Sequence, residues 1–257
     1  MSTELSATDE AGALSMNDWY DQLTVALIEQ ICEPDANTVD IGAGAGDILR
    51  HLLRVAPRGR HVAVEALPSY AEGLRRDFPG VTVVAAAAAE RTGRDSFVHV
   101  VSNPGYSGLR RRPYDRPDET LRELTVDTVR LDDVLPGDRR IDLVKVDTEG
   151  GEVLALRGAV ELLRRWRPVI VFEHGGDHAM REYGTTSADL WALLVTELGY
   201  ELRTLPGRRA GQPALDRAGF ADALREHWYF VADRPSPGPA GGSGQHEPSA
   251  WQKGTEP

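Results

Sequence analysis

The sequence predicts an α/β fold, in which a doubly wound, mostly parallel sheet carries helices on both faces. Short runs rich in Val, Ile and Ala alternate with longer amphipathic stretches, and this alternation is typical of a parallel sheet covered on both sides. The first such run is followed directly by the glycine-rich segment "GAGAG". Right-handed crossovers in a doubly wound sheet place the binding crevice at the carboxyl ends of the strands.

The predicted helices show apolar residues at helical spacing and recognisable ends. Asp47 suits the start of the second helix, Pro68 lies in the first turn of the third, and Ser187 and Gly199 bound the last. The strands are apolar runs that end at glycine or at polar residues. The helices span 19–31, 47–56, 67–78, 151–166 and 187–200, and the strands span 37–41, 61–66, 81–87, 141–147, 168–174, 200–205 and 227–233.

The chain of 257 residues fits one large domain, which we place at 18–233. Within it, a β-rich insertion at about 94–125 interrupts the alternation. The flanking segments 1–17 and 234–257 are small and polar or rich in Pro, Gly and Ser. Such segments cannot bury enough apolar surface to offset their ordering entropy, so we expect both to be disordered.

Composition excludes several classes of function. The net charge of −11 argues against general binding of nucleic acid, and the single cysteine, Cys32, excludes an internal disulfide framework. Neither a signal peptide nor an apolar run that could span a bilayer is present. We therefore expect a cytoplasmic protein with no nucleic-acid or membrane partner, and the sequence leaves its oligomeric state open.

The segment "VDIGAGAGD" at 39–47 indicates a nucleotide-like ligand. Gly42, Gly44 and Gly46 permit close approach of a ligand to the backbone at a helix N-terminus. The segment lacks the Lys and Ser/Thr of a P-loop, and its spacing differs from the dinucleotide pattern. Glu65 ends the next strand, where an acid accepts hydrogen bonds from ribose hydroxyls.

Asp40, two residues before the first glycine, distinguishes between the remaining candidate ligands. A carboxylate there repels a pyrophosphate and suits a cofactor with cationic groups, as the sulfonium and amino groups of S-adenosylmethionine provide. We therefore favour S-adenosylmethionine over a nicotinamide dinucleotide. A nicotinamide-dependent oxidoreductase, a non-catalytic nucleotide-binding module and a metal-dependent hydrolase built on "HGGDH" stay as alternatives.

The chain resembles the FkbM-type methyltransferases, a branch of the class I S-adenosylmethionine-dependent enzymes that mostly modify hydroxyl oxygens. "LVKVDTEGGE" is the most specific of the segments that carry the resemblance, which covers roughly 35–205. The other segments, in order, are "VDIGAGAGD", "VAVEALPS", "AAAERTG", "TVRLDDVL", "PVIVFEH" and "LGYEL". The resemblance implies a Rossmann-like fold of three layers, with seven strands and an antiparallel edge.

The resemblance also implies the cofactor site. It places cofactor contacts at Asp40, Gly42, Gly44 and Glu65, and it places Asp147, at the end of the fourth strand, against the methyl group and substrate. To these we add Gly46 of the same loop and Ala87 at the start of "AAAERTG". The chain departs from the family at Ala43 and at Ala45-Gly46, where asparagine and a bulkier residue are frequent.

A hydroxyl acceptor must lose a proton, so a general base is expected beside the methyl group. Glu173 and His174 end the strand next to the fourth one and are expected to reach the same crevice. His174 titrates near neutrality and is the preferred base, with Asp147 and Glu173 completing the predicted catalytic set. Glu149 suits a catalytic role and a place at a helix N-terminus equally well, whereas Glu152 suits the helix N-terminus better. Lys145 lies close to Asp147 on the strand.

The same segment contains the ligand types of a divalent metal ion. His174, Asp177, His178, Asp147 and Glu173 supply nitrogen and oxygen atoms, and Mg²⁺ can acidify an acceptor hydroxyl. Because these residues show no recognisable ligand spacing, we predict no metal site and do not favour Mg²⁺.

The loop at 102–117, "SNPGYSGLRRRPYDRP", is long enough to serve as a lid or a substrate-binding wall. Its arginines at 110–112 either bind an anionic group of the acceptor or form a solvated basic turn. Tyr106 and Ser107 are expected to line the cofactor pocket. The sequence thus predicts an S-adenosylmethionine-dependent O-methyltransferase that acts on a hydroxyl of a small molecule, such as a sugar or a specialised metabolite.

Overall fold

The fold is seen in a computed structural model that describes residues 15–114 and 118–235. Most of the two end segments predicted to be disordered lies outside these residues. The first helix, α1 (Met16–Ile31), begins three residues before the predicted start, because Ser15 caps it through a hydrogen bond from the amide of Asp18.

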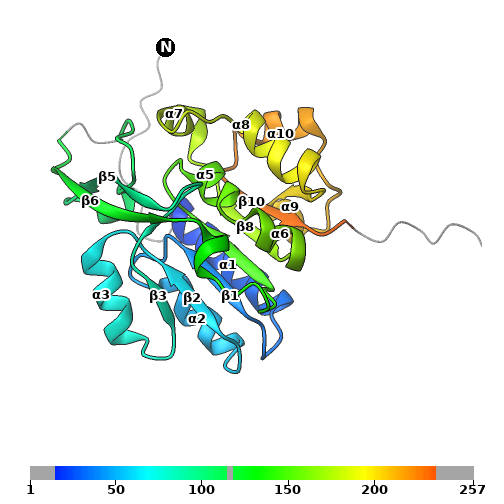
Figure 1. Ribbon diagram of the computed structural model, residues 1–257. Coiled ribbons are helices and arrows are strands. Elements are labelled where there is room, and N and C mark those ends of the chain that lie inside the picture. The colour runs from blue at the N-terminus through cyan, green and yellow to red at the C-terminus, as the bar shows by residue number, and fades with distance from the viewer. Residues whose placement is uncertain (1–14, 115–117, 236–257) are drawn as a thin grey trace, which may run out of the picture.

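The main sheet has seven strands in the order β3-β2-β1-β7-β8-β10-β9, with only β10 antiparallel to its neighbours. This arrangement confirms the predicted mostly parallel sheet with an antiparallel edge (Figure 1). All four residues of β1, β2 and β7 are buried, as expected for central strands covered on both faces. The strands are β1 (Thr38–Ile41), β2 (His61–Val64), β3 (Thr82–Val84), β7 (Leu143–Val146), β8 (Val169–Glu173), β9 (Glu201–Thr204) and β10 (Tyr229–Asp233).

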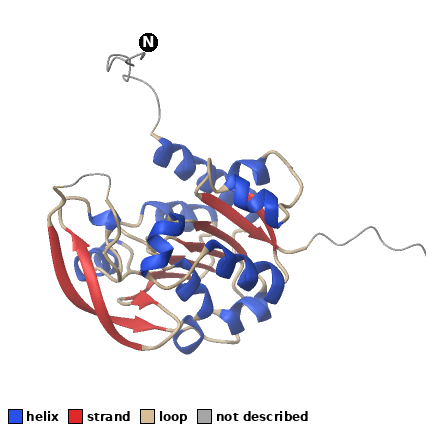
Figure 2. Cartoon of the chain, turned by 90° about the horizontal axis from the view of Figure 1, so that it is seen from above, coloured by secondary structure: helices blue, strands red, loops and turns tan. Residues whose placement is uncertain are grey.

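Helices cover both faces of this sheet and complete the three layers (Figure 2). Alternate residues of each strand enter opposite cores: Leu143 packs with the helices of one face and Val144 with those of the other. The first face carries α1, α2 (Asp47–Val55), α3 (Pro68–Asp77) and α9 (Leu205–Arg209). The second carries α4 (Leu131–Val134), α5 (Glu152–Arg157), α6 (Val160–Trp166), α7 (Gly176–Glu182), α8 (Ser187–Trp191) and α10 (Arg217–Ala223).

Two predicted helices are interrupted. The helix expected over 151–166 divides into α5 and α6 around Gly158, where a Cβ atom would lie 2.1 Å from the carbonyl oxygen of Ala89. The close approach of these two backbones therefore requires glycine. The helix expected over 187–200 begins as α8 and continues as a π-helical segment, Ala192–Glu197.

The β-rich middle of the chain forms a second, smaller sheet of three strands. The two long strands β5 (Gly93–Val100) and β6 (Leu121–Val129) pair antiparallel, and β4 (Ala87–Ala88) pairs with β6. The strand predicted at 81–87 is thus divided between β3 and β4, and it links the two sheets. A small core around Leu67 and Phe97 joins this second sheet to the start of α3. None of the described helices is long and apolar enough to cross a membrane.

Candidate active site

The glycine loop joins the end of β1 to the start of α2. Gly42, Gly44 and Gly46 all have positive φ, at 71°, 53° and 88°, which glycine adopts without steric cost. A Cβ atom on Gly42 would lie 1.8 Å from the carbonyl oxygen of Asp147, so the loop packs directly against the end of β7. A Cβ atom on Gly44 would meet nothing within 4 Å. Gly44 therefore leaves its backbone open to a ligand, while Gly46 begins the helix without lining the cavity.

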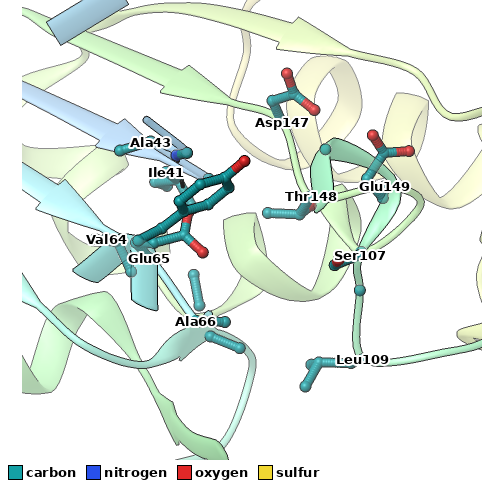
Figure 3. A pocket seen from close by; sticks show the side chains of 18 of the residues that line it. Ile41, Ala43, Val64, Glu65, Ala66, Ser107, Leu109, Asp147, Thr148 and Glu149 are labelled. Atoms are coloured by element: carbon teal, nitrogen blue, oxygen red, sulfur yellow. Dashed lines mark hydrogen bonds between the residues drawn. The ribbon is translucent and has the colours of Figure 1, made fainter. Parts of the chain in front are cut away.

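A cavity of about 370 Å³ opens at the carboxyl ends of β1, β2 and β7, and this volume suits a small-molecule ligand. The predicted residues Gly42, Gly44, Glu65, Ala87 and Asp147 all line it. Figure 3 shows Glu65 on one side of the cavity, with Asp147 and Glu149 on the other. The topology thus brings together most of the predicted cofactor residues from four separate segments.

Glu65 is only 7% exposed and forms part of the cavity wall. One carboxylate oxygen accepts the Gly44 amide at 2.9 Å, and the other accepts the Leu67 amide at 2.7 Å. Burial raises the pKa of Glu65, while these two amide bonds act against the rise. Its carboxylate is held at the end of β2, the position from which it is predicted to accept hydrogen bonds from ribose hydroxyls.

Asp40 does not line the cavity, contrary to the expectation of direct contact with a cofactor. It is fully buried beside Lys145, which occupies the paired position on β7. The Lys145 ammonium lies 3.6 Å from Asp40 and 3.3 Å from Asp147, and it donates to the Gly42 carbonyl at 3.0 Å. Burial alone would lower the pKa of Lys145, but the two carboxylates raise it above its ordinary value. Asp40 therefore acts on the cavity through Lys145.

Asp147 directly follows β7 and accepts a hydrogen bond from the Tyr229 hydroxyl at 3.0 Å. Its burial favours the neutral acid, but Lys145 and hydrogen bonds from Glu173 and Tyr229 outweigh burial and lower its pKa. Glu173, paired with Tyr229 across the sheet, does not line the cavity, and burial together with the charge of Asp147 raises its pKa well above the ordinary value. Of these two neighbouring acids, Asp147 is thus the stronger acid and Glu173 holds its proton more tightly.

Glu149 lines the cavity two residues after Asp147. Its carboxylate lies 2.5 Å from the Arg112 guanidinium, and both side chains are 14% exposed. Burial, followed by the charge of Asp147, raises the pKa of Glu149 to about 8, with Arg112 opposing the rise. One carboxylate oxygen each from Asp147, Glu149 and Glu173 lie within 4.8 Å of one another.

The segment 102–114 forms a wall of the cavity. Ser107 lines it as expected, and Tyr106 does not. Gly108 pairs with Val98 of β5 through two backbone hydrogen bonds, of 2.8 and 3.1 Å, and Ser107 accepts the Val100 amide at 3.0 Å. The remaining residues 115–117 of the predicted loop lie outside the described residues. Because Arg110 and Arg112 bond to acidic groups of the protein, they do not form a solvated turn.

His174 lies outside this cavity, which corrects the prediction that it reaches the same crevice as Asp147. Successive side chains of a strand point to opposite faces, so Glu173 and His174 diverge. His174 is 4% exposed and borders a second cavity of about 610 Å³. Its Nδ1 accepts the Gly176 amide at 3.1 Å, and Nε2 lies 3.1 Å from the Ser187 hydroxyl.

These bonds show which protons His174 and Ser187 carry. Because Nδ1 accepts, Nε2 holds the proton and donates to Ser187, whose hydroxyl donates in turn to Asp177. Burial lowers the pKa of His174. The bonding order is the reverse of a nucleophile activated by a base, so the "HGGDH" segment does not build the hydrolase site considered above.

The structure also separates the residues considered as metal ligands. Asp177 and His178 lie on α7, and Asp177 borders the second cavity. Among the described residues, the group whose ligand atoms are close enough for an ion is Asp147, Glu149 and Glu173. Glu152 is buried and accepts the amides of Thr148 and Gly150 at 3.2 and 3.0 Å, so it shapes the turn.

Sequence reasoning missed several residues of the site. Asp21 of α1, Tyr70 of α3 and Tyr183 line the cavity, and Tyr229 bonds to Asp147 from 82 residues away. None of them belongs to a segment that carries the resemblance. Asp21 and Tyr229 reach the site only because α1 and β10 pack beside β7 and β8.

Comparison with known proteins gives one family match. The family described as the methyltransferase FkbM domain matches residues 40–202. The chain is also 26% identical over 253 residues to the AMB antimetabolite synthetase AmbE of Pseudomonas aeruginosa. That alignment covers 80% of this chain and 12% of AmbE, so the chain spans about an eighth of its length.

Two solved structures illustrate the structural similarities. The methyltransferase FkbM of Methylobacillus flagellatus has a TM-score of 0.49 at 20% identity, covering 78% of this chain and 44% of that one. The sugar N-methyltransferase KedS8 of a Streptoalloteichus species has a TM-score of 0.42 at 12% identity, covering 92% of this chain and 99% of that one.

Proposed function

This chain belongs to the methyltransferase FkbM family, and from that premise we propose that it transfers a methyl group from S-adenosylmethionine to a hydroxyl oxygen of a small molecule. A sugar or a specialised metabolite is the acceptor class that we favour.

The placement of Glu65 carries the proposal. Its buried carboxylate faces the cavity from the end of β2 and accepts the amide of Gly44. The space beside Gly44 is open to a ligand. A nucleoside lying in the cavity against both residues would donate its ribose hydroxyls to Glu65, and Ala87 would leave room for the base. The residues therefore fit S-adenosylmethionine, which supplies an electrophilic methyl group on a sulfonium.

The chain's own residues suit the positioning of an acceptor. Asp147 and Glu149 line the end of the cavity opposite Glu65, where acceptor oxygens can be hydrogen-bonded (Figure 3). Lys145 holds Asp147 and the Gly42 carbonyl together, so the glycine loop and the acceptor side keep a constant distance. Much of the rate of an in-line transfer comes from such positioning.

Calorimetric titration with S-adenosylhomocysteine tests the cofactor. We expect micromolar binding by the full chain and a loss of at least about tenfold in Glu65→Ala, because a charge-assisted acceptor of two hydroxyls is removed. Glu72→Ala is the matched control, since Glu72 is an exposed acid on α3 that does not line the cavity. Binding of NAD in place of the adenosyl ligand would contradict the proposal.

The acceptor is tested separately. The protein is incubated with S-adenosylmethionine and a panel of sugars and hydroxylated metabolites, and methylated products are detected by mass spectrometry. We expect transfer to oxygen. Transfer only to amine nitrogen, or cofactor binding without turnover on any hydroxyl, would overturn the acceptor proposed here.

A further inference from the structure

We propose that Glu149 is the general base of the transfer and that Arg112, from the β5–β6 insertion, is the residue that positions it. This inference rests on the proposed function, because it concerns the proton that a hydroxyl acceptor must release. It replaces His174, which lies outside the cavity.

Glu149 is the carboxylate of the acceptor side that is best placed to accept a proton. It lines the cavity, whereas Glu173 does not. The Oδ2 atom of Asp147 already faces the Tyr229 hydroxyl at 3.0 Å and the Lys145 ammonium at 3.3 Å. A carboxylate stabilised by these donors is a weak base, because each of them favours its ionised form. Asp147 is therefore suited to orient the hydroxyl and Glu149 to accept its proton.

Arg112, from the segment 102–114, holds Glu149 in place. Its guanidinium lies 2.5 Å from the Glu149 carboxylate and is the only ion-pair partner that the described chain provides for it. The guanidinium also lies over the rings of Tyr106 and Tyr114, with centroid distances of 4.6 and 5.9 Å. Cation–π contacts of this kind restrict the arginine to one place. A residue from the insertion thus holds the proposed base in position.

The backbone conformation of Glu149 also indicates that the surrounding structure holds this residue in place. Glu149 has a φ of 57°, a left-handed conformation that is unfavourable for a residue other than glycine. The turn is held by the buried Glu152 carboxylate, which accepts the amides of Thr148 and Gly150. Strain of this kind persists where the surrounding structure determines it and is concentrated at functional sites.

Methyl transfer and loss of the hydroxyl proton take place in a single displacement. The acceptor oxygen forms a bond to the methyl carbon while the carbon–sulfur bond breaks and its electron pair stays on sulfur. The hydroxyl proton passes to Glu149, so the products are the methyl ether, S-adenosylhomocysteine and a neutral Glu149 side chain. Release of that proton to solvent restores the base.

The environment of Glu149 makes its protonation state dependent on Arg112. Only the ionised carboxylate can accept a proton, so the rate is expected to rise as the pH rises through its pKa, about 8 in the free protein. Removal of the guanidinium removes a favourable charge and moves that pKa upward. Several titratable or charged groups act on Glu149 or are acted on by it: Arg112, Tyr114, Lys145, Asp147, Glu152, Glu173 and Tyr183.

The experiment compares Glu149→Gln, Arg112→Met and Arg112→Lys with Arg110→Met as the matched control. Arg110 belongs to the same segment, but it pairs with Asp95 at 2.9 Å and not with Glu149. We expect Glu149→Gln to lower kcat by at least about a hundredfold, the usual contribution of a general base. We expect Arg112→Met to lower kcat/KM and move the pH midpoint upward by about one unit, Arg112→Lys to retain most of both, and Arg110→Met to leave the midpoint unchanged.

Two readouts do not depend on turnover. Calorimetric affinity for S-adenosylhomocysteine is expected to stay within about threefold in Glu149→Gln, which would show that the cofactor site is intact. Carbon-13 NMR of protein labelled at the glutamate carboxyl groups would follow the pKa of Glu149 directly, with Glu149→Gln assigning the signal. An unshifted Glu149 pKa in Arg112→Met, or a full rate in Glu149→Gln, would overturn this inference. Failure of the unmodified protein to bind S-adenosylhomocysteine would instead overturn the proposed function.

Discussion

Asp40 and Lys145 occupy paired positions on the neighbouring parallel strands β1 and β7, and their charged groups lie 3.6 Å apart. Asp40 is completely buried, and neither of its carboxylate oxygens has a hydrogen-bond partner among the described residues. Burial raises the pKa of Asp40, and Lys145 is the nearest charge that opposes the rise. The pair therefore connects the strand before the glycine loop to the strand that carries Asp147.

We expect Lys145→Met to lower the free energy of unfolding at pH 7 by about 3–5 kcal/mol, because it leaves a buried carboxylate without a counter-charge. The loss should decrease as the pH is lowered, since protonation removes the charge of Asp40. Urea denaturation at several pH values measures it. The double variant Asp40→Asn/Lys145→Met should lose less than the single one, and an equal or greater loss would show that the ion pair is not the cause.

The glycine loop gives a second prediction. Gly42→Ala is expected to destabilise the protein by more than about 2 kcal/mol, because the added Cβ would overlap the Asp147 carbonyl oxygen at 1.8 Å in a left-handed conformation. Gly44→Ala is the matched control, with a similar φ and open space around the added atom. It should cost only the conformational strain, about 1–2 kcal/mol, while weakening the binding of S-adenosylhomocysteine. Similar unfolding free energies for the two variants would contradict this account.

His174 is expected to support stability and not catalysis. His174→Ala leaves the Gly176 amide and the Ser187 hydroxyl without their partner and should cost about 1–3 kcal/mol. Because burial lowers the pKa of His174 below 6.5, the unfolded chain binds its proton more readily. The stability from neutral His174 is therefore complete above pH 6.5 and falls as the pH is lowered below it. Thermal unfolding against pH measures this, and a kcat unchanged in the folded variant would separate His174 from the reaction.

Metal dependence gives a fourth prediction. The carboxylate oxygens of Asp147, Glu149 and Glu173 are close enough to contact one ion. The nearby Arg112 and Lys145 disfavour a divalent cation there, since each already pairs with one of these acids. Methyl transfer and S-adenosylhomocysteine affinity are therefore expected to be the same with EDTA and with added Mg²⁺. Activity that disappears with EDTA and returns with Mg²⁺ would show that the three acids hold an ion.

The sequence by itself determined the fold class and the residues that meet at the proposed cofactor end of the cavity. Each central strand is a short apolar run, and burial on both faces leaves few alternatives to a parallel sheet for such runs. Gly42, Gly44 and Glu65 could be placed because each lies shortly after the end of a strand, and the strand ends of a parallel sheet meet at one edge. These are local signals, since only the neighbouring residues are needed to find them.

The tertiary structure decided the proposed acceptor end of the cavity, where groups far apart in the chain act on one another. Sequence spacing could not show that Tyr229 reaches Asp147, that Arg112 reaches Glu149, or that Asp40 acts through Lys145. It also could not show that His174 faces away from the cavity, because the side of a strand on which each residue lies depends on its exact register. Proton positions at such a site depend on burial and on nearby charges, and both arise only when the chain is folded.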